Sequence, residues 1–175
     1  MASAEPRYEI EFKNADYEIR HYAAFLVAET VIQDSFEAVG KKAFRILADY
    51  IFGQNNSKTK ISMSVPVMTQ PNFGPMLGQG FKVQFALLDG FNVETAPQPL
   101  DSRVQVHEIS PRRMAALAYS GSWSEENFKQ HLDKLLVCLE RDHLKTLGLP
   151  IIAKYNSPFQ PSFLRRNEVL IEVQR

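Results

Sequence analysis

The sequence predicts an α+β domain in which two long helices pack on a strongly curved or barrel-like antiparallel sheet of about eight or nine strands. Three observations lead to this prediction. The chain has 175 residues, enough for one domain with a core and few for two. Short segments of alternating or β-branched residues outnumber two long amphipathic segments. The same order of strands, helix, glycine and strand occurs twice, and Phe36 and Phe128 open the two helices 92 positions apart.

The two copies cover about residues 17–95 and 103–174. Two copies are too few for a solenoid, which needs at least three repeating units. The repetition therefore predicts a single domain over residues 7–175 with internal pseudo-two-fold symmetry, preceded by a disordered tail of residues 1–6. A ligand is expected at or beside the junction of the two halves.

The first copy contains a run of strands interrupted by one helix. Asp34 and Glu37 have the spacing of a capping box at the helix start, and Gly53 marks its end. Alternation or β-branched residues predict the strands, which are expected at 7–12, 16–22, 24–32, 61–67 and 81–87. Two prolines and three glycines predict a long turn over residues 71–80.

The second copy repeats this order of elements. Ser122 and Glu125 again have the capping-box spacing, and the helix is expected to continue to about Leu147, before Gly148. Strands are expected at 103–109, 114–121, 151–155 and 168–174.

Composition narrows the class of protein. A formal net charge of zero and a pI near 6.9 disfavour a general nucleic-acid binder. The apolar runs are far below the roughly 18 residues of a transmembrane span. Cys138 is the single cysteine, so no intrachain disulfide forms and a cytoplasmic location is expected. The sequence lacks a nucleophile elbow, a phosphate loop and a dinucleotide fingerprint, so we expect no enzyme. It leaves the oligomeric state open.

The first helix carries the sharpest signal for a binding site. Phe44, Ala48 and Phe52 fall on a flank beside the predicted core stripe, together with Lys41 and Arg45. An apolar flank edged by cations suits a flat hydrophobic ligand that carries carboxylates. The alternative is a wide core face over which Lys41 and Arg45 extend their aliphatic stems.

The second helix lacks this signal. At the offset of 92 residues, Lys41 and Ala48 correspond to Asp133 and Glu140. An anionic ligand would be attracted by the first helix and repelled by the second. The difference between the two copies therefore favours the first helix as the ligand side.

Five motifs together are similar to those of a known family. They occur in the expected order, and the chain resembles the SOUL haem-binding protein family over about residues 17–173. The matching segments are 17–22 (YEIRHY), 50–55 (YIFGQN), 60–67 (KISMSVPV), 155–159 (YNSPF) and 165–169 (RRNEV).

The resemblance implies a distorted antiparallel β-barrel flanked by two long α-helices. It also implies a non-enzymatic carrier or buffer of haem or another tetrapyrrole. It places the ligand in a shallow cleft between the first helix and the loop before the last strand. Carried over by motif position, that cleft would include Lys41, Phe44, Ala48 and Tyr155. In another branch of the family the histidine at the position of His21 is proposed as an axial iron ligand, although a lone strand histidine is commonly a surface residue.

The sequence departs from the family pattern at two positions, and two alternative functions remain open. Asp49 and Gln160 stand where cleft-type members carry lysines, which removes expected partners of the haem propionates. One alternative function is binding of other amphipathic small molecules, as in two-repeat effector domains of bacterial regulators, whose pockets often use a buried acid to select cations. The other is a protein-interaction module without a small ligand.

Overall fold

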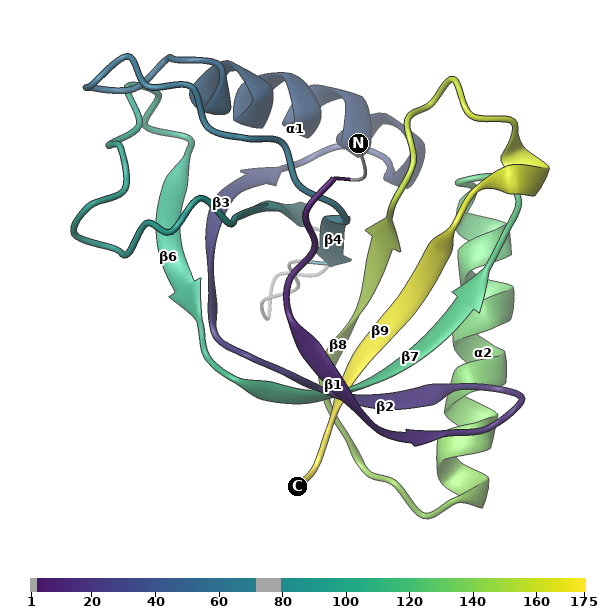
Figure 1. The fold of residues 1–175 in the computed structure, drawn as a ribbon. Helices are drawn as coiled ribbons and strands as arrows, with labels where there is room; N and C mark the ends of the chain where they lie inside the picture. The colour runs from purple at the N-terminus through teal and green to yellow at the C-terminus, as the bar shows by residue number, and fades with distance from the viewer. Residues whose placement is uncertain (1–2, 72–79) are drawn as a thin grey trace.

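The fold is one nine-stranded antiparallel sheet with two helices packed on it (Figure 1). A computed structural model describes residues 3–71 and 80–175, and all statements here concern that part of the chain. The helices are α1 (Phe36–Ile51) and α2 (Glu125–Arg141). The strands are β1 (Tyr8–Lys13), β2 (Glu18–Tyr22), β3 (Phe25–Ile32), β4 (Val67–Pro71), β5 (Phe81–Leu87), β6 (Gln105–Ile109), β7 (Arg112–Tyr119), β8 (Thr146–Lys154) and β9 (Asn167–Val173).

The sheet is strongly bent but open (Figure 1). Its strand order is β1-β2-β7-β9-β8-β4-β5-β3-β6, and no ladder joins β1 to β6 within the described residues. The α+β class and the antiparallel strands are confirmed, whereas the expected closed barrel does not form. Both edge strands carry charged or polar side chains, among them Glu9 and Glu11 on β1 and Glu108 on β6, which blunt the edges against further pairing.

The order of elements is the same in the two halves. β3-α1-β4-β5 is followed by β7-α2-β8-β9, and the three strands of each set are neighbours in the sheet. The two sets meet where β4 pairs with β8, with Val67 opposite Lys154 and Thr69 opposite Ile152. This order agrees with the predicted repeat, and the pseudo-symmetry itself stays a prediction.

The helices begin one or two residues later than their capping boxes predicted. Ser35 caps α1, since its hydroxyl accepts a hydrogen bond from the Ala38 amide at 3.3 Å. Ser124 caps α2 and accepts from the Asn127 amide at 3.1 Å. Asp34, the expected first cap, pairs with Lys42 instead.

Two other segments differ from the prediction. α2 ends at Arg141, and Leu147 and Gly148 belong to β8, so the expected extension of the helix to Leu147 is wrong. His143 follows the helix in the left-handed region, with φ 57°, and ends it without a glycine. Of the expected strand 61–67, only Val67 lies in a strand. The turn expected over 71–80 falls almost wholly on residues 72–79, outside the described residues.

Side-chain alternation divides the core between the two faces of the sheet. On β3, Leu26 and Ala28 pack with α1, whereas Phe25 and Val27 face the other side. On β7, Ala115 packs with α2 while its neighbours face away. Neither helix is long and apolar enough to cross a membrane, judged over the described residues.

The N-terminal residues that are described make specific contacts. Ala4 forms a parallel bridge with Ser64, and the Val65 amide donates to the Ala4 carbonyl at 2.9 Å. Arg166 pairs with Glu5 at 2.8 Å. These contacts lie within the segment for which the sequence predicts a tail.

A buried ion pair joins β2 to β9 across β7. The Arg20 guanidinium donates to both Glu168 carboxylate oxygens, at 2.9 and 2.6 Å, and the side chains are only 4% and 2% exposed. The Tyr155 hydroxyl donates to Glu168 Oε1 at 2.5 Å, while Arg20 also donates to the Tyr22 hydroxyl and to Glu18. Burial alone would raise the pKa of Glu168, but its hydrogen bonds and the Arg20 charge hold that pKa below the usual range.

Removing one partner of this pair should be strongly destabilising. Arg20→Met or Glu168→Gln leaves a buried group without its partner, so we expect the free energy of unfolding to fall by about 3–5 kcal/mol. Urea unfolding monitored by circular dichroism measures this. Lys129→Met, which removes the exposed Lys129–Glu125 pair, is the control and should cost less than about 1 kcal/mol. Equal losses for the buried and exposed pairs would contradict the prediction.

The same pair should contribute to acid sensitivity. The folded-state pKa of Glu168 lies below its ordinary value of 4.5. Its contribution to stability is therefore complete above the unfolded-state pKa and is lost as pH falls through the folded one. The difference in unfolding free energy between wild type and Glu168→Gln should be constant near neutral pH and shrink below about pH 4.5. A difference that grew on acidification would show the opposite shift.

Candidate functional site

A cavity of about 730 Å³ lies between α1, the segment that leads into β4, and the residues at and after the end of β8. Because β4 and β8 pair at the join of the two strand sets, the cavity opens at that junction. Its lining residues are Ser3, Glu37, Gly40, Lys41, Phe44, Met63, Val65, Val67, Thr69, Trp123, Lys154, Tyr155, Asn156, Ser157 and Pro158.

The walls of the cavity are mainly apolar and aromatic. Phe44 projects from α1 and packs on Phe85, with ring centroids 5.4 Å apart. Trp123 is fixed in position because its indole nitrogen donates to Asn167 Oδ1 at 2.7 Å. The Arg165 guanidinium covers the Trp123 ring at 4.1 Å from its centroid. Together these contacts build a preformed apolar surface of the kind that binds small ligands.

Two lysines add positive charge to this surface. Lys41 is exposed on α1, and Lys154 is half-buried at the end of β8. Among the described residues, no carboxylate lies within ion-pair distance of either amine. Burial, followed by the charge of Arg165, lowers the pKa of Lys154 to about 8. Glu37 is the one acid among the lining residues and is exposed in the first turn of α1.

The register of β8 and β9 explains why Lys154 meets Trp123. Lys154 lies opposite Asn167 in the ladder, and Asn167 holds the indole of Trp123. The Lys154 ammonium is thereby placed 4.9 Å from the centroid of the Trp123 ring. Gly40 of α1 faces the same amine, since a Cβ there would lie 3.5 Å from Lys154 Nζ.

Tyr155 links the cavity to the buried ion pair. Its hydroxyl is bound by Glu168, and the Arg166 guanidinium lies 3.7 Å from the centroid of its ring. Burial and the nearby Glu168 charge raise the pKa of Tyr155 far above the usual range. Tyr155 therefore acts as a fixed, neutral wall of the cavity.

The cavity contains three of the side chains expected at the binding site: Lys41, Phe44 and Tyr155. Arg45 is exposed one turn further along α1, and Ala48 is 7% exposed in the core. Phe52 caps the C-terminal end of α1 and is 62% exposed. None of these last three lines the cavity.

Sequence reasoning missed Trp123 and Lys154 as site residues. Lys154 is the one charged residue in the apolar run 151–155, which is a usable sequence signal. Trp123 carries no such signal, because its position depends on the hydrogen bond to Asn167.

His21 lies elsewhere, on β2. Its Nε2 is 2.7 Å from Glu11 Oε1, the side chain is 50% exposed, and it does not line the cavity. Over the described residues, no group of three or more His, Cys, Asp and Glu side chains is arranged to hold a metal ion. Asp49 and Gln160, the two departures from the family lysines, are also absent from the cavity lining.

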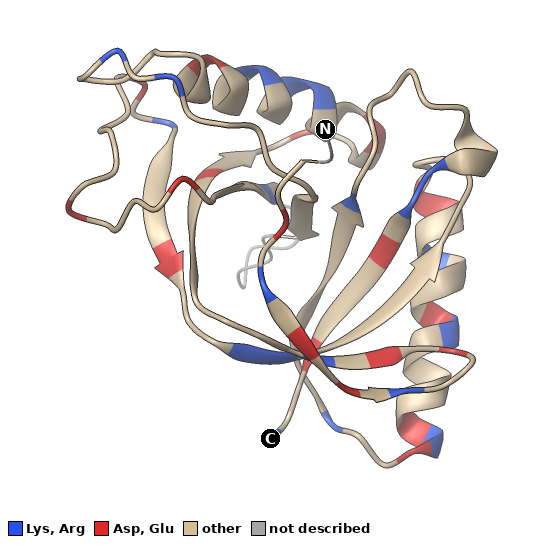
Figure 2. Cartoon of the chain, viewed as in Figure 1, with Lys and Arg blue, Asp and Glu red and all other residues tan. Residues whose placement is uncertain are grey.

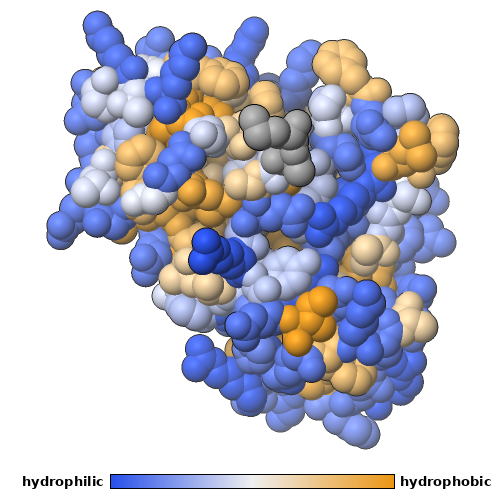
Figure 3. Space-filling model, viewed as in Figure 1, coloured by the Kyte–Doolittle hydropathy of each residue, from blue (hydrophilic) through white to orange (hydrophobic). Residues whose placement is uncertain are grey.

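The charge distribution distinguishes the two helices. Figure 2 shows charges of both signs on each helix. In sequence, α1 has three cations and two acids, whereas α2 has three cations and four acids. Figure 3 shows apolar surface interspersed with hydrophilic side chains on this face of the molecule. In the segment between β8 and β9, beside the cavity, Phe159 and Phe163 are exposed. The charged side chains that line the cavity are therefore Lys41 and Glu37 from α1 and Lys154 from β8.

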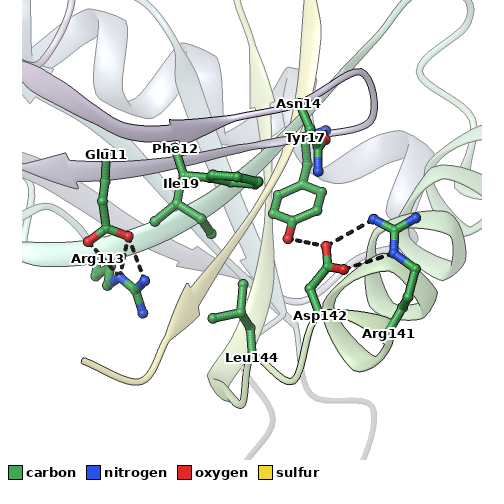
Figure 4. Close-up of a pocket in the computed structure, with 9 residues that line it drawn as sticks. All are labelled: Glu11, Phe12, Asn14, Tyr17, Ile19, Arg113, Arg141, Asp142 and Leu144. Carbon is green, nitrogen blue, oxygen red and sulfur yellow. Dashed lines mark hydrogen bonds and ion pairs between the residues drawn. The ribbon is translucent and has the colours of Figure 1, made fainter.

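A second hollow, of about 410 Å³, lies between the β1–β2 hairpin and the end of α2 (Figure 4). Its charges are paired with each other: Arg113 with Glu11 at 2.5 Å, and Arg141 with Asp142 at 2.9 Å. The Tyr17 hydroxyl also donates to Asp142 at 2.6 Å, and hydrogen bonds from Arg141 and Tyr17 lower the pKa of Asp142 to about 2. The charged groups of this hollow are therefore less available to a ligand than Lys41 and Lys154 of the cavity.

Solved structures of other proteins share this fold. The C-terminal domain of EcmrR has a TM-score of 0.70 at 11% identity and covers 96% of this chain and 98% of that domain. A hydrolase from Listeria innocua has a TM-score of 0.66 at 11% identity and covers 94% of each chain. At these identities the similarity concerns the fold alone.

Sequence comparisons identify the family. Heme-binding protein 2 of Homo sapiens is 26% identical over 163 residues, covering 91% of this chain and 78% of the relative. Heme-binding protein 1 of Xenopus laevis is 24% identical over 162 residues, covering 91% of this chain and 82% of the relative. The family profile described as SOUL heme-binding protein matches residues 3–172. Because that match spans nearly the whole chain, the chain belongs to the SOUL heme-binding protein family, as its motifs predicted.

Proposed function

We propose that this protein binds haem or a related tetrapyrrole reversibly, as a carrier or buffer, in the cavity between α1 and the end of β8. The observation that carries the proposal is an apolar cavity bordered by two lysines, Lys41 and Lys154, that have no carboxylate partner among the described residues. Family membership and the names of the two relatives support the same class of ligand.

The side chains of the cavity fit the chemistry of a porphyrin. A porphyrin has two flat apolar faces and carries carboxylates at one edge. Phe44, Val67 and Trp123 offer apolar surface, and Lys41 and Lys154 offer charge-assisted hydrogen bonds to carboxylates. Haem would supply its iron, while the chain would supply burial and charge neutralisation. The proposed role is binding without catalysis.

The buried acid favours an anionic ligand over a cationic one. A pocket that selects cations needs a carboxylate whose charge is free to meet the ligand. Glu37, the acid that lines the cavity, is exposed to water in the first turn of α1. The buried acid Glu168 binds Tyr155 of the cavity wall, and both of its oxygens are already bound by Arg20. A cation would have to displace Arg20 and leave it unpaired in the core, at a cost of several kcal/mol.

Lys41 and Arg45 provide a matched test of where the ligand binds. Both are exposed cations on α1, but only Lys41 lines the cavity. Lys41→Ala should weaken hemin binding by about threefold to tenfold through loss of one partly exposed ion pair, whereas Arg45→Ala should change it less than about twofold. Titration followed at the Soret band measures both affinities. A wild-type spectrum identical to that of free hemin would rule out haem binding, and equal losses for the two variants would rule out this location.

His21 provides a test of the iron ligand. Because His21 lies outside the cavity and pairs with Glu11, His21→Ala should leave the Soret maximum of the hemin complex unchanged. Absorption spectra of the two complexes, recorded at saturating protein, measure this. A shifted maximum would mean that hemin binds at β2 and that the cavity is not its site.

A further inference from the structure

We propose that Lys154 is a reactive amine that captures apolar aldehydes and ketones in the cavity as reversible imines. This inference does not rest on haem binding, since it concerns the amine and its surroundings in the protein without hemin.

The position of Lys154 gives a small molecule access to its amine. The side chain lines the 730 Å³ cavity and is half-buried, so the amine meets the cavity interior rather than bulk water. Trp123 lies on one side, with its ring centroid 4.9 Å from Nζ, and Gly40 lies on another. The ladder partners Val67 and Asn167 fix the backbone from which the side chain projects.

The surroundings increase the fraction of Lys154 in the neutral amine form, which is the nucleophilic form. Within ion-pair distance the described residues offer Lys154 no carboxylate, and burial lowers its pKa to about 8. Arg165, stacked on Trp123, lowers that pKa further by repulsion. The other charged or titratable lining groups are Glu37 and Lys41 on α1, and Tyr155, which its bond to Glu168 keeps neutral. A lysine desolvated beside another cation is the usual arrangement for imine-forming lysines.

The reaction needs no oxidant, reductant or cofactor. The lone pair of the neutral Lys154 amine attacks the carbonyl carbon, and a nitrogen–carbon bond forms as the oxygen takes up a proton. The nitrogen loses a proton, and the resulting carbinolamine expels its hydroxyl as water to give the imine. Hydrolysis reverses these steps. Proton exchange with water balances the sequence.

The lining selects the class of carbonyl compound. Phe44, Met63, Val65 and Trp123 favour an aromatic or aliphatic body over a sugar, whose hydroxyls would lose hydrogen bonds to water. Lys41, at the exposed side of the cavity, would favour a carboxylate on the far end of the ligand. Aromatic aldehydes with a carboxylate are therefore the preferred probes.

Reductive trapping tests the inference directly. The protein is incubated at pH 7 with 4-carboxybenzaldehyde and sodium cyanoborohydride, which reduces the imine to a stable secondary amine, and peptides are mapped by mass spectrometry. At pH 7 about one Lys154 side chain in ten lacks its proton, given its pKa of about 8, against about one in 2,500 for an ordinary lysine. We expect Lys154 to be modified at least about tenfold faster than Lys134, an exposed lysine on α2. Modification of Lys154 at or below the rate of Lys134 would overturn the inference.

Two further measurements separate reactivity from folding. Lys154→Arg keeps the positive charge and should abolish trapping at this position while urea unfolding stays within about 1 kcal/mol of wild type. In competitive labelling with acetic anhydride, wild-type Lys154 should reach its plateau of reactivity above about pH 8, whereas added Nα-acetyllysine amide continues to gain reactivity toward about pH 10.4. Parallel profiles for the two amines would contradict the proposal even if the arginine variant failed to fold.

Discussion

The bidentate ion pair between Arg20 and Glu168 is the constraint on which the rest of this structure depends. It joins residues 148 positions apart and ties β2 to β9 across the intervening strand β7. A buried charge is tolerated only when it is paired and hydrogen-bonded, so neighbouring elements must supply the remaining partners. Tyr155 is one of these partners and stands at the end of β8. The buried ion pair thus fixes the position of Tyr155, which lines the cavity.

The cavity lies beside α1, where the two strand sets meet. The two sets contribute different residues at this join. At the join, Val67 of β4 faces Lys154 of β8, and Lys154 in turn lies opposite Asn167. Asn167 positions Trp123, which comes from the segment before α2. Both halves therefore contribute to one site, and each supplies one of its two lysines, Lys41 from α1 and Lys154 from β8. In the second hollow, at the end of α2, the charged side chains form ion pairs with each other, such as Arg141–Asp142.

Most of the fold could be predicted because its signals are local. Periodicity located both helices and most strands, and it placed Lys41 and Phe44 on the flank of α1 that lines the cavity. Features that depend on long-range contacts could not be predicted in this way. The extension of β8 through Gly148 depends on pairing with β9, and barrel closure depends on whether β1 meets β6. Helical angles likewise could not separate Ala48, which the core covers, from the exposed Phe44 beside it.

Lys154 shows why unpaired charge is informative in this molecule. The buried Arg20 has a matched carboxylate, and exposed ion pairs such as Lys129–Glu125 cost little to form or lose. Lys154 is desolvated without such a partner among the described residues, and its lowered pKa of about 8 expresses that cost in free energy. A methionine of similar length would fill the same space without the cost of burying a charge. The amine therefore weakens the folded state, and such a group is best explained by a ligand that pairs with it or reacts with it.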